Sequence, residues 1–431
     1  MLTMNFTYRI YPDAIQEQLM QSWLETCRFV YNRALRQLKD WIASRKSPIE
    51  RCSLVKEYII PANTPFPSYQ RQQNDLPKLK KEIPELSQVY SQVLQTTVRR
   101  LHDTWDAFQA RGFGFPRFKK FGQFTSFVFP QFQSSPITNY HIKLPKIGYV
   151  RINMHRPIPE GFVVKQVRVL SKCRNTQWYV VVTIQSGVSV PDVSMHGRAI
   201  GIDLGLERFL TTSDGSSVER PKFFKSLKSE LRLLQLRGAR RQKRSKNWEK
   251  AQTKVARLHH KIANTRKDYH LKTAHSLCNQ AQTIFVEDLN TVGLNRGMLR
   301  KECVDASFGA FLSLLQWVCW KRGVYFRRVD PRGTSQTCPE CQATVTKLLS
   351  EREHICPDCG YRTHRDHAAA SMVLLRGIEL ISTAGLAGME TACADELAGN
   401  ESSSQVSKSR KGVTRKSPRR LREARTITRS V

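Results

Sequence analysis

Four cysteines in the C-terminal third of the chain form two C-x-x-C pairs, Cys338 with Cys341 and Cys356 with Cys359. Each pair begins Cys-Pro, and two such pairs supply four thiolates, the ligand set of a tetrahedral Zn²⁺ site. A site closed by four protein ligands is structural rather than catalytic, so we expect a zinc ribbon at 335–360. The rival interpretation is a redox dithiol, which is disfavoured because neither pair opens a helix after a strand.

Three acids stand at the ends of predicted elements outside the ribbon. Asp203 and Glu287 each lie near the end of an apolar strand, and Asp366 opens the last helix. A carboxylate in an apolar strand is costly to bury without a partner, which sets Asp203 and Glu287 apart from ordinary surface acids. Asp366 alone would be read as a helix N-cap. Asp288 faces the other side of its strand, and we expect no catalytic role for it.

The order of elements connects these acids. Without the ribbon, residues 199–380 read strand, hairpin, helix, strand, helix, strand, helix, which is the order of an RNase H-like nuclease core. Phosphodiester hydrolysis needs a nucleophilic water and a neutralised leaving oxyanion, and two Mg²⁺ ions about 4 Å apart supply both. Because hard cations prefer carboxylate oxygens, we predict that Asp203, Glu287 and Asp366 converge as a magnesium-binding catalytic triad.

The first half of the chain mixes two periodicities. Residues 4–11 alternate as a strand, and helical patterns cover 13–41, with Asp13 and Gln16 as a capping box, and about 77–110. From about 125 to 187 the period is two, with Pro, Gly and Asn turns between short strands. We therefore predict a small antiparallel β-barrel, completed by the N-terminal strand, into which the helices are inserted.

The charge of the chain predicts its class of partner. It has 431 residues and a net charge of +34, spread along the sequence, which favours a long phosphate backbone over a small acidic ligand. A basic membrane-surface protein would need an amphipathic anchor or a lipidation signal, and no apolar run reaches the roughly 18 residues of a membrane span. Without a signal-peptide h-region we expect a cytoplasmic protein whose eleven cysteines form no disulfides.

Two basic segments have open interpretations. Residues 221–275 are rich in Lys and Arg, and they form either a solvated helix face or a surface that follows phosphates. Between Phe113 and Lys120 aromatic and basic residues alternate, a composition that can bind nucleic acid by stacking and charge. The Trp and Phe residues at helical spacing are expected to pack in cores.

At this point the chain resembles the TnpB (OrfB) proteins of insertion sequences, relatives of compact type V CRISPR effectors. The resemblance covers about residues 4–380. It is carried, in order, by YRIYP, CRFVYNRAL, SQVLQTTVRRL, GFPRFK, GIDLG, SDG, NTRKDYHLKTAHSL, VEDLN, TSQTCPEC, CPDCG and HRDHAAA. It implies a transposon-associated RNA-guided DNA endonuclease, with guide RNA and target DNA as partners. It also implies Zn²⁺ on the four cysteines and Mg²⁺ on the three acids.

The resemblance also implies an α+β multidomain fold, a barrel with an inserted helical lobe followed by an RNase H-like (RuvC-like) nuclease domain with an inserted zinc ribbon. The expected parts are a wedge-like β-barrel at 1–12 and 121–190, a helical recognition lobe at 13–120, the RuvC-like domain at 198–334 and 361–385, the zinc ribbon at 335–360, and a basic disordered tail at 386–431. Such a protein would be cytoplasmic and associated with the nucleoid.

One departure from the family pattern keeps alternatives open. The family commonly has R-D-x-N-A-A and a further asparagine two residues on, but Ala368 and Met372 stand there in this chain. Those asparagines would orient the metal-bearing acid. The alternatives are a nuclease-impaired RNA-guided DNA-binding protein or repressor, a transposase performing strand transfer, and a plain zinc-ribbon DNA-binding protein. The last leaves Asp203 and Glu287 unexplained. The residues specify neither the guide sequence, the adjacent motif nor the oligomeric state.

Overall fold

The computed structural model describes the chain except Met1, 47–58, 113, 133–134, 139, 191, 295–296, 298, 349–350 and 397–431. The chain divides into two units, Met1–Leu374 and Leu375–Val431. Most of the predicted basic tail, from 397 onward, therefore lies outside the described residues, as does Phe113. The described part mixes helices with three β-sheets, which confirms the predicted α+β character.

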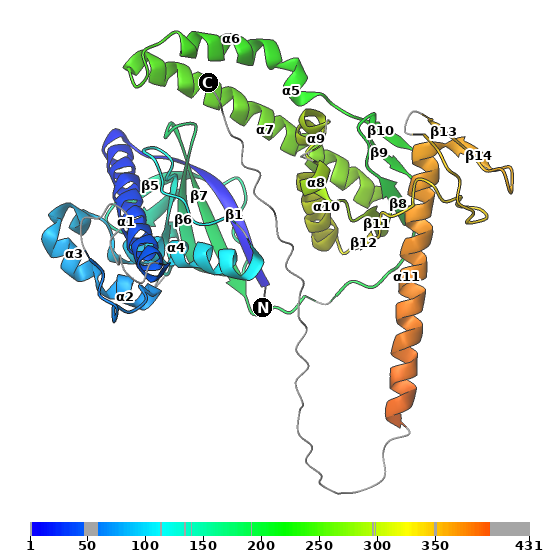
Figure 1. The fold of residues 1–431 in the computed structure, drawn as a ribbon, viewed down its shortest axis with the longest axis horizontal. Helices are drawn as coiled ribbons and strands as arrows, with labels where there is room; N and C mark the ends of the chain where they lie inside the picture. Colours follow the sequence, from blue (N-terminus) through cyan, green and yellow to red (C-terminus); the bar gives the residue numbers. More distant parts are fainter. Residues whose placement is uncertain are drawn as a thin grey trace, which may run out of the picture. The chain divides into compact units, whose positions relative to one another are not determined.

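The first sheet is antiparallel, with the order β2-β6-β7-β1-β5-β4-β3. Its strands β1, β5, β6 and β7 are labelled in Figure 1. The strands are β1 (Leu2–Tyr11), β2 (Ser126–Phe129), β3 (Ile137–Thr138), β4 (His141–Leu144), β5 (Gly148–Asn153), β6 (Val163–Lys172) and β7 (Gln177–Ser186). The N-terminal strand β1 belongs to this sheet, as predicted, and it lies between β7 and β5. The predicted closed barrel is wrong, because β2 and β3 are unpaired edges among the described strands. The sheet is a half-barrel.

Helices of the N-terminal half cover this sheet. They are α1 (Ala14–Lys46), α2 (Tyr69–Asn74), α3 (Leu76–Glu82), the 3₁₀ helix η1 (Pro84–Gln88) and α4 (Ser91–Arg111). The capping box is confirmed, since Gln16 N–H donates to Asp13 Oδ1 at 2.7 Å and Asp13 N–H to Gln16 Oε1 at 3.2 Å. Trp23 of α1 is fully buried against Phe127 of β2, with ring centroids 5.5 Å apart, so the predicted core packing also holds.

The helical stretch predicted at 77–110 is broken into three pieces. Pro77 lies in the first turn of α3, and Pro84 opens η1 after Ile83 has left the helical conformation at ψ 91°. Proline removes a backbone donor and disfavours helix in the residue before it. Local backbone chemistry therefore overrides the amphipathic pattern that continues through this stretch.

The second sheet has the order β10-β9-β8-β11-β12. Its strands are β8 (Ala199–Asp203), β9 (Arg208–Thr212), β10 (Ser217–Glu219), β11 (Thr283–Glu287) and β12 (Tyr325–Val329). Strand β11 runs parallel to both neighbours, with Thr283 opposite Ala199 and Tyr325, while β9 and β10 are antiparallel additions. The carboxyl ends of the three parallel strands therefore meet at one edge of the sheet.

The helices of this half are α5 (Phe223–Ser226), α6 (Lys228–Ala239), α7 (Lys246–Gln280), α8 (Thr291–Leu294), α9 (Arg300–Ala306) and α10 (Phe308–Arg322). One helical stretch, Arg300–Arg322, is apolar and long enough to cross a membrane, but half of it is buried. Phe311, Leu315 and Cys319 within it belong to the core that covers the second sheet. This stretch is a core helix, which agrees with the sequence prediction.

A small hairpin of β13 (Glu353–Ile355) and β14 (Arg362–His364) leads directly into α11 (Arg365–Glu396). Helix α11 crosses β8 at Gly201. A Cβ atom added there would lie 2.2 Å from the carbonyl oxygen of Ala370 and 2.5 Å from the nitrogen of Leu374. The glycine of the GIDLG segment therefore lets the helix backbone lie directly on the strand. The helix continues past the predicted end at Leu380 to Glu396.

Candidate active site and zinc site

The three predicted acids come from three different elements. Asp203 ends β8 and Glu287 ends β11, and their predecessors Ile202 and Val286 are paired in parallel register. The two acids therefore end neighbouring strands at the same edge of the sheet. Asp366 is the second residue of α11, the helix that lies on β8.

The carboxylates are close enough to repel one another. The pKa of Asp203 is raised from 3.8 to about 8, first by burial and then by the negative charges of Glu287 and Asp366. The backbone N–H of Leu204 and the charge of Arg365 act in the opposite direction. The fold thus places an acid where its ionised form is unfavourable unless a cation compensates it, which is the environment expected of a metal ligand.

Glu287 is held by a residue that sequence reasoning missed. The Thr334 hydroxyl donates a hydrogen bond to Glu287 Oε1, and both residues are buried, with exposed fractions of 3% and 9%. Thr334 Oγ1 also lies 3.0 Å from the carbonyl oxygen of Pro331. Thr334 belongs to the loop that leads into the first cysteine pair. The one sequence signal that included it is the TSQTCPEC segment of the family resemblance.

The first turn of α11 is fixed by a histidine beside Asp366. His367 Nε2 lies 3.0 Å from the carbonyl oxygen of Ser213, and its Nδ1 lies 2.9 Å from Thr363 Oγ1. The first contact connects α11 to the turn between β9 and β10, and the second connects it to β14. The backbone N–H of Asp366 donates to His364 Nδ1 at 3.2 Å. The Asp366 carboxylate is therefore carried on a turn whose position is fixed from two sides.

Two neighbouring positions bear on the predictions. The side chain of Asp288 is 64% exposed and forms an ion pair with Arg328 at 3.2 Å, away from the buried Glu287. Ala368 and Met372, where the family commonly has asparagines, are 1% and 5% exposed. In this chain those two positions are apolar parts of the core rather than polar neighbours of the acids.

The four cysteines form the second site. Their sulfur atoms all lie within 4.8 Å of one another, with 3.7 Å between the Sγ atoms of Cys338 and Cys359 and 3.5 Å between those of Cys341 and Cys356. Four sulfurs at the usual Zn–S distance of about 2.3 Å form a tetrahedron with edges of about 3.8 Å. The cluster therefore fits the ligand set of a zinc ion.

The backbone around the cysteines supports the same ligand set. Gln342 N–H donates to the carbonyl of Cys338 at 2.9 Å, and Gly360 N–H to that of Cys356 at 3.0 Å, so each pair forms one tight turn. Gln342 and Gly360 both have positive φ, at 61° and 72°. The backbone N–H of Cys359 is the main cause that lowers the pKa of the Cys356 thiol to about 7. The turn of the second pair therefore favours the thiolate of Cys356.

Among the residues that the structure describes, the four cysteines are the only group of three or more His, Cys, Asp or Glu residues gathered closely enough to hold a metal ion. The three carboxylates do not form such a group, so the metal site predicted for Asp203, Glu287 and Asp366 stays a prediction.

Three family profiles match the chain. Residues 179–297 match the OrfB family described as "Probable transposase", residues 308–373 match "Cas12f1-like, TNB domain", and residues 1–47 match an OrfB-associated "Helix-turn-helix domain". The last segment is one strand followed by the single uninterrupted helix α1 in this structure. The three matches follow the same order as the motifs of the TnpB resemblance.

Curated relatives match nearly the whole chain. "Putative RNA-guided DNA endonuclease InsQ" of Escherichia coli (strain K12) is 30% identical over 392 residues, 86% of this chain and 92% of that protein. A "Putative RNA-guided DNA endonuclease" of Streptomyces pristinaespiralis is 29% identical over 415 residues, 94% of each chain. The chain belongs to the TnpB (OrfB) family, which is related to the compact type V effectors.

Solved structures give a weaker similarity. A "Cas12f1-sgRNA-target DNA complex" aligns over 84% of this chain and 82% of its own, with 14% identity and a TM-score of 0.49. The "mini-RNA-guided endonuclease CRISPR-Cas_phi3" aligns over 55% of this chain and 57% of its own, with 12% identity and a TM-score of 0.37. The family assignment rests on the sequence matches.

Proposed function

We propose that this protein is a transposon-associated RNA-guided DNA endonuclease that cleaves target DNA by metal-dependent phosphodiester hydrolysis. The observation that carries the proposal is that Asp203, at the end of the strand beside that of Glu287, has a pKa raised by burial and by the charges of Glu287 and Asp366. Membership of a family whose curated relatives are named as RNA-guided DNA endonucleases supports it.

The sheet order supports an RNase H-like, RuvC-like nuclease domain at 198–334 and 361–385, interrupted by the zinc ribbon at 335–360. Two antiparallel strands flank one side of three parallel ones, and Asp203 and Glu287 stand where two of the parallel strands end. The half-barrel at 1–12 and 121–190 would be the wedge-like domain, and the helices at 13–120 the recognition lobe. Residues 386–431 would be an accessory basic tail, whose first part belongs to α11.

Asp203, Glu287 and Asp366 would hold the catalytic Mg²⁺. Bound magnesium would provide a nucleophilic water and neutralise the leaving oxyanion. The protein's own side chains would position the acids and release a proton. Thr334 keeps the Glu287 carboxylate in one orientation, His367 fixes the turn that carries Asp366, and Asp203 gives up its proton when the site is loaded.

Guide RNA and target DNA would be the partners. A net charge of +34 suits two long polyanions, and it also favours association with the nucleoid in the cytoplasm. The exposed basic face of α6 and α7 is one candidate surface for phosphates. In guided proteins base pairing reads the target, so the residues of this chain would not determine the sequence that is cut.

Cleavage of a guided target tests the proposal. The protein is purified with the RNA that accompanies it, and the guide segment of that RNA defines a matched DNA target. With Mg²⁺ we expect the unmodified protein to cut, Asp203→Ala to bind without cutting, and Asp288→Ala, the exposed neighbour of Glu287, to cut normally. A protein that binds its target but leaves it whole with Mg²⁺, Mn²⁺ and Co²⁺ contradicts the nuclease assignment.

A nuclease-impaired RNA-guided DNA-binding protein or repressor is the second candidate, and the buried Ala368 and Met372 are the observation that favours it. Under this alternative the natural protein binds its target without cutting, and Ala368→Asn with Met372→Asn restores cleavage. Strong cutting by the natural sequence rules it out. A transposase would instead produce strand-transfer products, which sequencing of the reaction ends would detect.

A further inference from the structure

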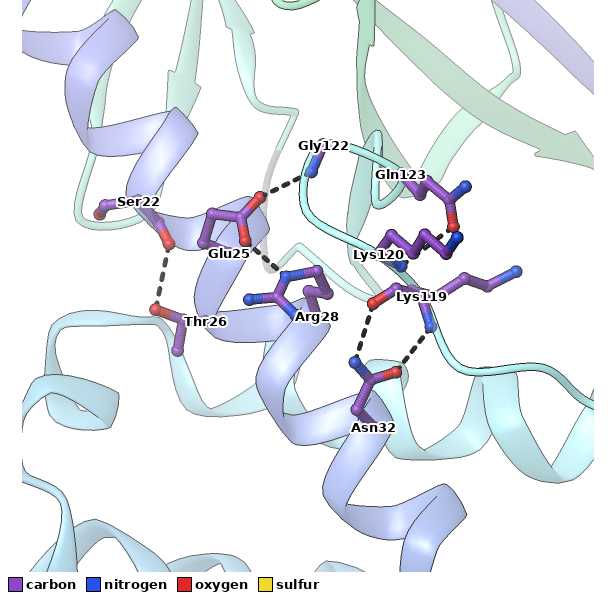
Figure 2. A network of polar contacts seen from close by, with 9 residues as sticks. All are labelled: Ser22, Glu25, Thr26, Arg28, Asn32, Lys119, Lys120, Gly122 and Gln123. Carbon is purple, nitrogen blue, oxygen red and sulfur yellow. Dashed lines mark hydrogen bonds and ion pairs between the residues drawn. The ribbon is translucent and has the colours of Figure 1, made fainter. Parts of the chain in front are cut away.

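The loop at 114–124, which joins α4 to β2, is fastened to α1 by its backbone (Figure 2). The Asn32 side chain makes a two-way contact, since its amide donates to the carbonyl of Lys119 at 2.9 Å and its oxygen accepts from Lys119 N–H at 2.8 Å. Gly122 N–H donates to Glu25 Oε1 at 3.2 Å. Backbone held by side chains of a helix cannot collapse freely, so the shape of this loop is set by α1.

The inner side of the loop is packed. Phe124 is 3% exposed, with the Arg100 guanidinium 4.9 Å from its ring centroid. Phe115 lies against Trp105 and Phe108 at centroid distances of 5.5 and 5.3 Å. These aromatic residues account for the loop's own stability, and none of them needs an external partner.

The outer side of the loop is different. Phe121 is 77% exposed and Phe118 is 43% exposed. The Lys39 ammonium lies 4.6 Å from the Phe118 centroid, and Arg117 and Lys120 are exposed on the same short segment. A single exposed phenylalanine is unremarkable. Here two exposed rings stand among cations on a backbone that α1 holds in place. Such a surface suits a ligand with an aromatic face and a negative charge.

We propose that this loop binds unpaired nucleotides of a nucleic-acid strand, with a base stacked on Phe121 and the adjoining phosphates on Arg117 and Lys120. Every base has a stacking face, and aromatic platforms flanked by cations are the usual means of binding single strands. The proposal takes from the proposed function only that the protein handles nucleic acid, and it needs no cleavage. A membrane surface fits less well, because an apolar contribution from one or two rings gives weak insertion.

The test is direct binding of fluorescent, unstructured oligonucleotides to the full-length protein freed of nucleic acid by high salt. The probes are a twelve-nucleotide oligo(U) RNA and the matching oligo(dT) DNA. We expect Phe121→Ala to weaken binding by about 5- to 100-fold, the range that corresponds to one lost base stack, and Phe121→Tyr to restore it. Ile15→Ala, which removes an 80% exposed apolar side chain elsewhere on α1, is the matched control and should bind normally.

Salt dependence and cross-linking separate stacking from charge. Lys120→Gln should lower the slope of log K against log salt by the amount expected for about one phosphate contact. Phe121→Ala should instead lower the affinity and leave the slope unchanged. Oligonucleotides containing 4-thiouridine or 4-thiothymidine should cross-link to a peptide within 114–124. The relative affinities of the RNA and DNA probes show which strand the loop prefers.

The loop should also depend on its attachment. Asn32→Ala removes both contacts to Lys119, so Phe121→Ala should cost less in that background than in the natural one. Unchanged affinity of Phe121→Ala for both oligonucleotides overturns the proposal, as does a loss confined to phosphatidylserine vesicles. These affinities are measured without divalent cations and need no cleavage. Failure of cleavage and failure of the loop are thereby distinguishable.

Discussion

Asp203 should make the magnesium-free protein less stable as the pH rises. Its carboxyl pKa is raised from 3.8 to about 8 in the folded chain, so between these values the folded state keeps a proton that the unfolded chain has released. Folding then loses about 1.4 kcal/mol for each pH unit across this window. The protonated Asp203 leaves the folded protein at its full stability below the pKa of the unfolded chain. The loss of stability is complete above about pH 8.

Asp203→Asn keeps the shape of the side chain and removes the titration. Between pH 5 and pH 7 the wild type should lose about 2.5 kcal/mol relative to this variant. For a domain of this size that is about 5–10 °C in Tm. Titrating groups that do not interact with Asp203, such as the buried His270 whose pKa is lowered to about 4, cancel in the difference.

The assay is the thermal midpoint of wild type and variant at pH 5, 6, 7 and 8, without divalent cations. Chelators are omitted, because they would remove zinc from the cysteine cluster. Asp288→Asn, whose side chain is 64% exposed, should follow the wild type within about 0.5 kcal/mol. Mg²⁺ added at pH 8 should stabilise the wild type and not Asp203→Asn. Parallel pH profiles for wild type and Asp203→Asn would refute the reasoning.

Two further substitutions test the support of the site. Thr334→Val removes the hydroxyl that donates to the buried Glu287 carboxylate, so we expect a loss of about 1–3 kcal/mol in stability and slower cleavage, both recovered by Thr334→Ser. Full activity in the valine variant would contradict the positioning role. Gly201→Ala places a Cβ 2.2 Å from a backbone oxygen of α11, and it should lower the Tm and weaken metal-dependent cleavage, whereas Gly187→Ala, with nothing within 4 Å, should change neither. A tolerated Gly201→Ala would show that α11 need not lie directly on β8.

Periodicity and composition were sufficient for much of the fold. The alternation of residues 4–11 and 125–187 predicts an antiparallel sheet that includes the N-terminal strand, and β1 does belong to that sheet. The acids Asp203 and Glu287 stood out because a charge in an apolar strand needs compensation. Each of these signals is local, so a single sequence contains it.

Closure of the sheet and the supports of the acids were not predictable in this way. Whether β2 meets β3 depends on the curvature of the whole sheet, to which no residue pattern corresponds. Thr334 and His367 support the acids through contacts with residues that are distant in sequence. Thr334 contacts Glu287, and His367 contacts Ser213. A threonine in a loop and a histidine in a helix have many ordinary roles, and only their positions in space distinguish them.

The zinc ribbon joins two supports of the acid site, and this arrangement predicts that the two metals are coupled. Thr334, which holds Glu287, stands at the entrance of the ribbon. At its exit, Arg365 N–H donates to the carbonyl of Arg352 at 2.7 Å, one residue before Asp366. Loss of zinc should therefore leave both Thr334 and the segment before Asp366 less firmly positioned.

Cys356→Ser tests this coupling without relying on cleavage. The variant should contain less than one zinc per chain by elemental analysis. In the Cys356→Ser background, the pH profiles of stability measured with Asp203 and with Asp203→Asn should differ less. The reason is that acids that have moved apart repel one another less and become better hydrated. Cys173→Ser, a buried cysteine of the N-terminal half outside the cluster, should leave both the zinc content and the pH difference intact. If zinc-free protein kept the full pH effect of Asp203, the ribbon would be an independent module, and the acids would be positioned by the sheet and α11 alone.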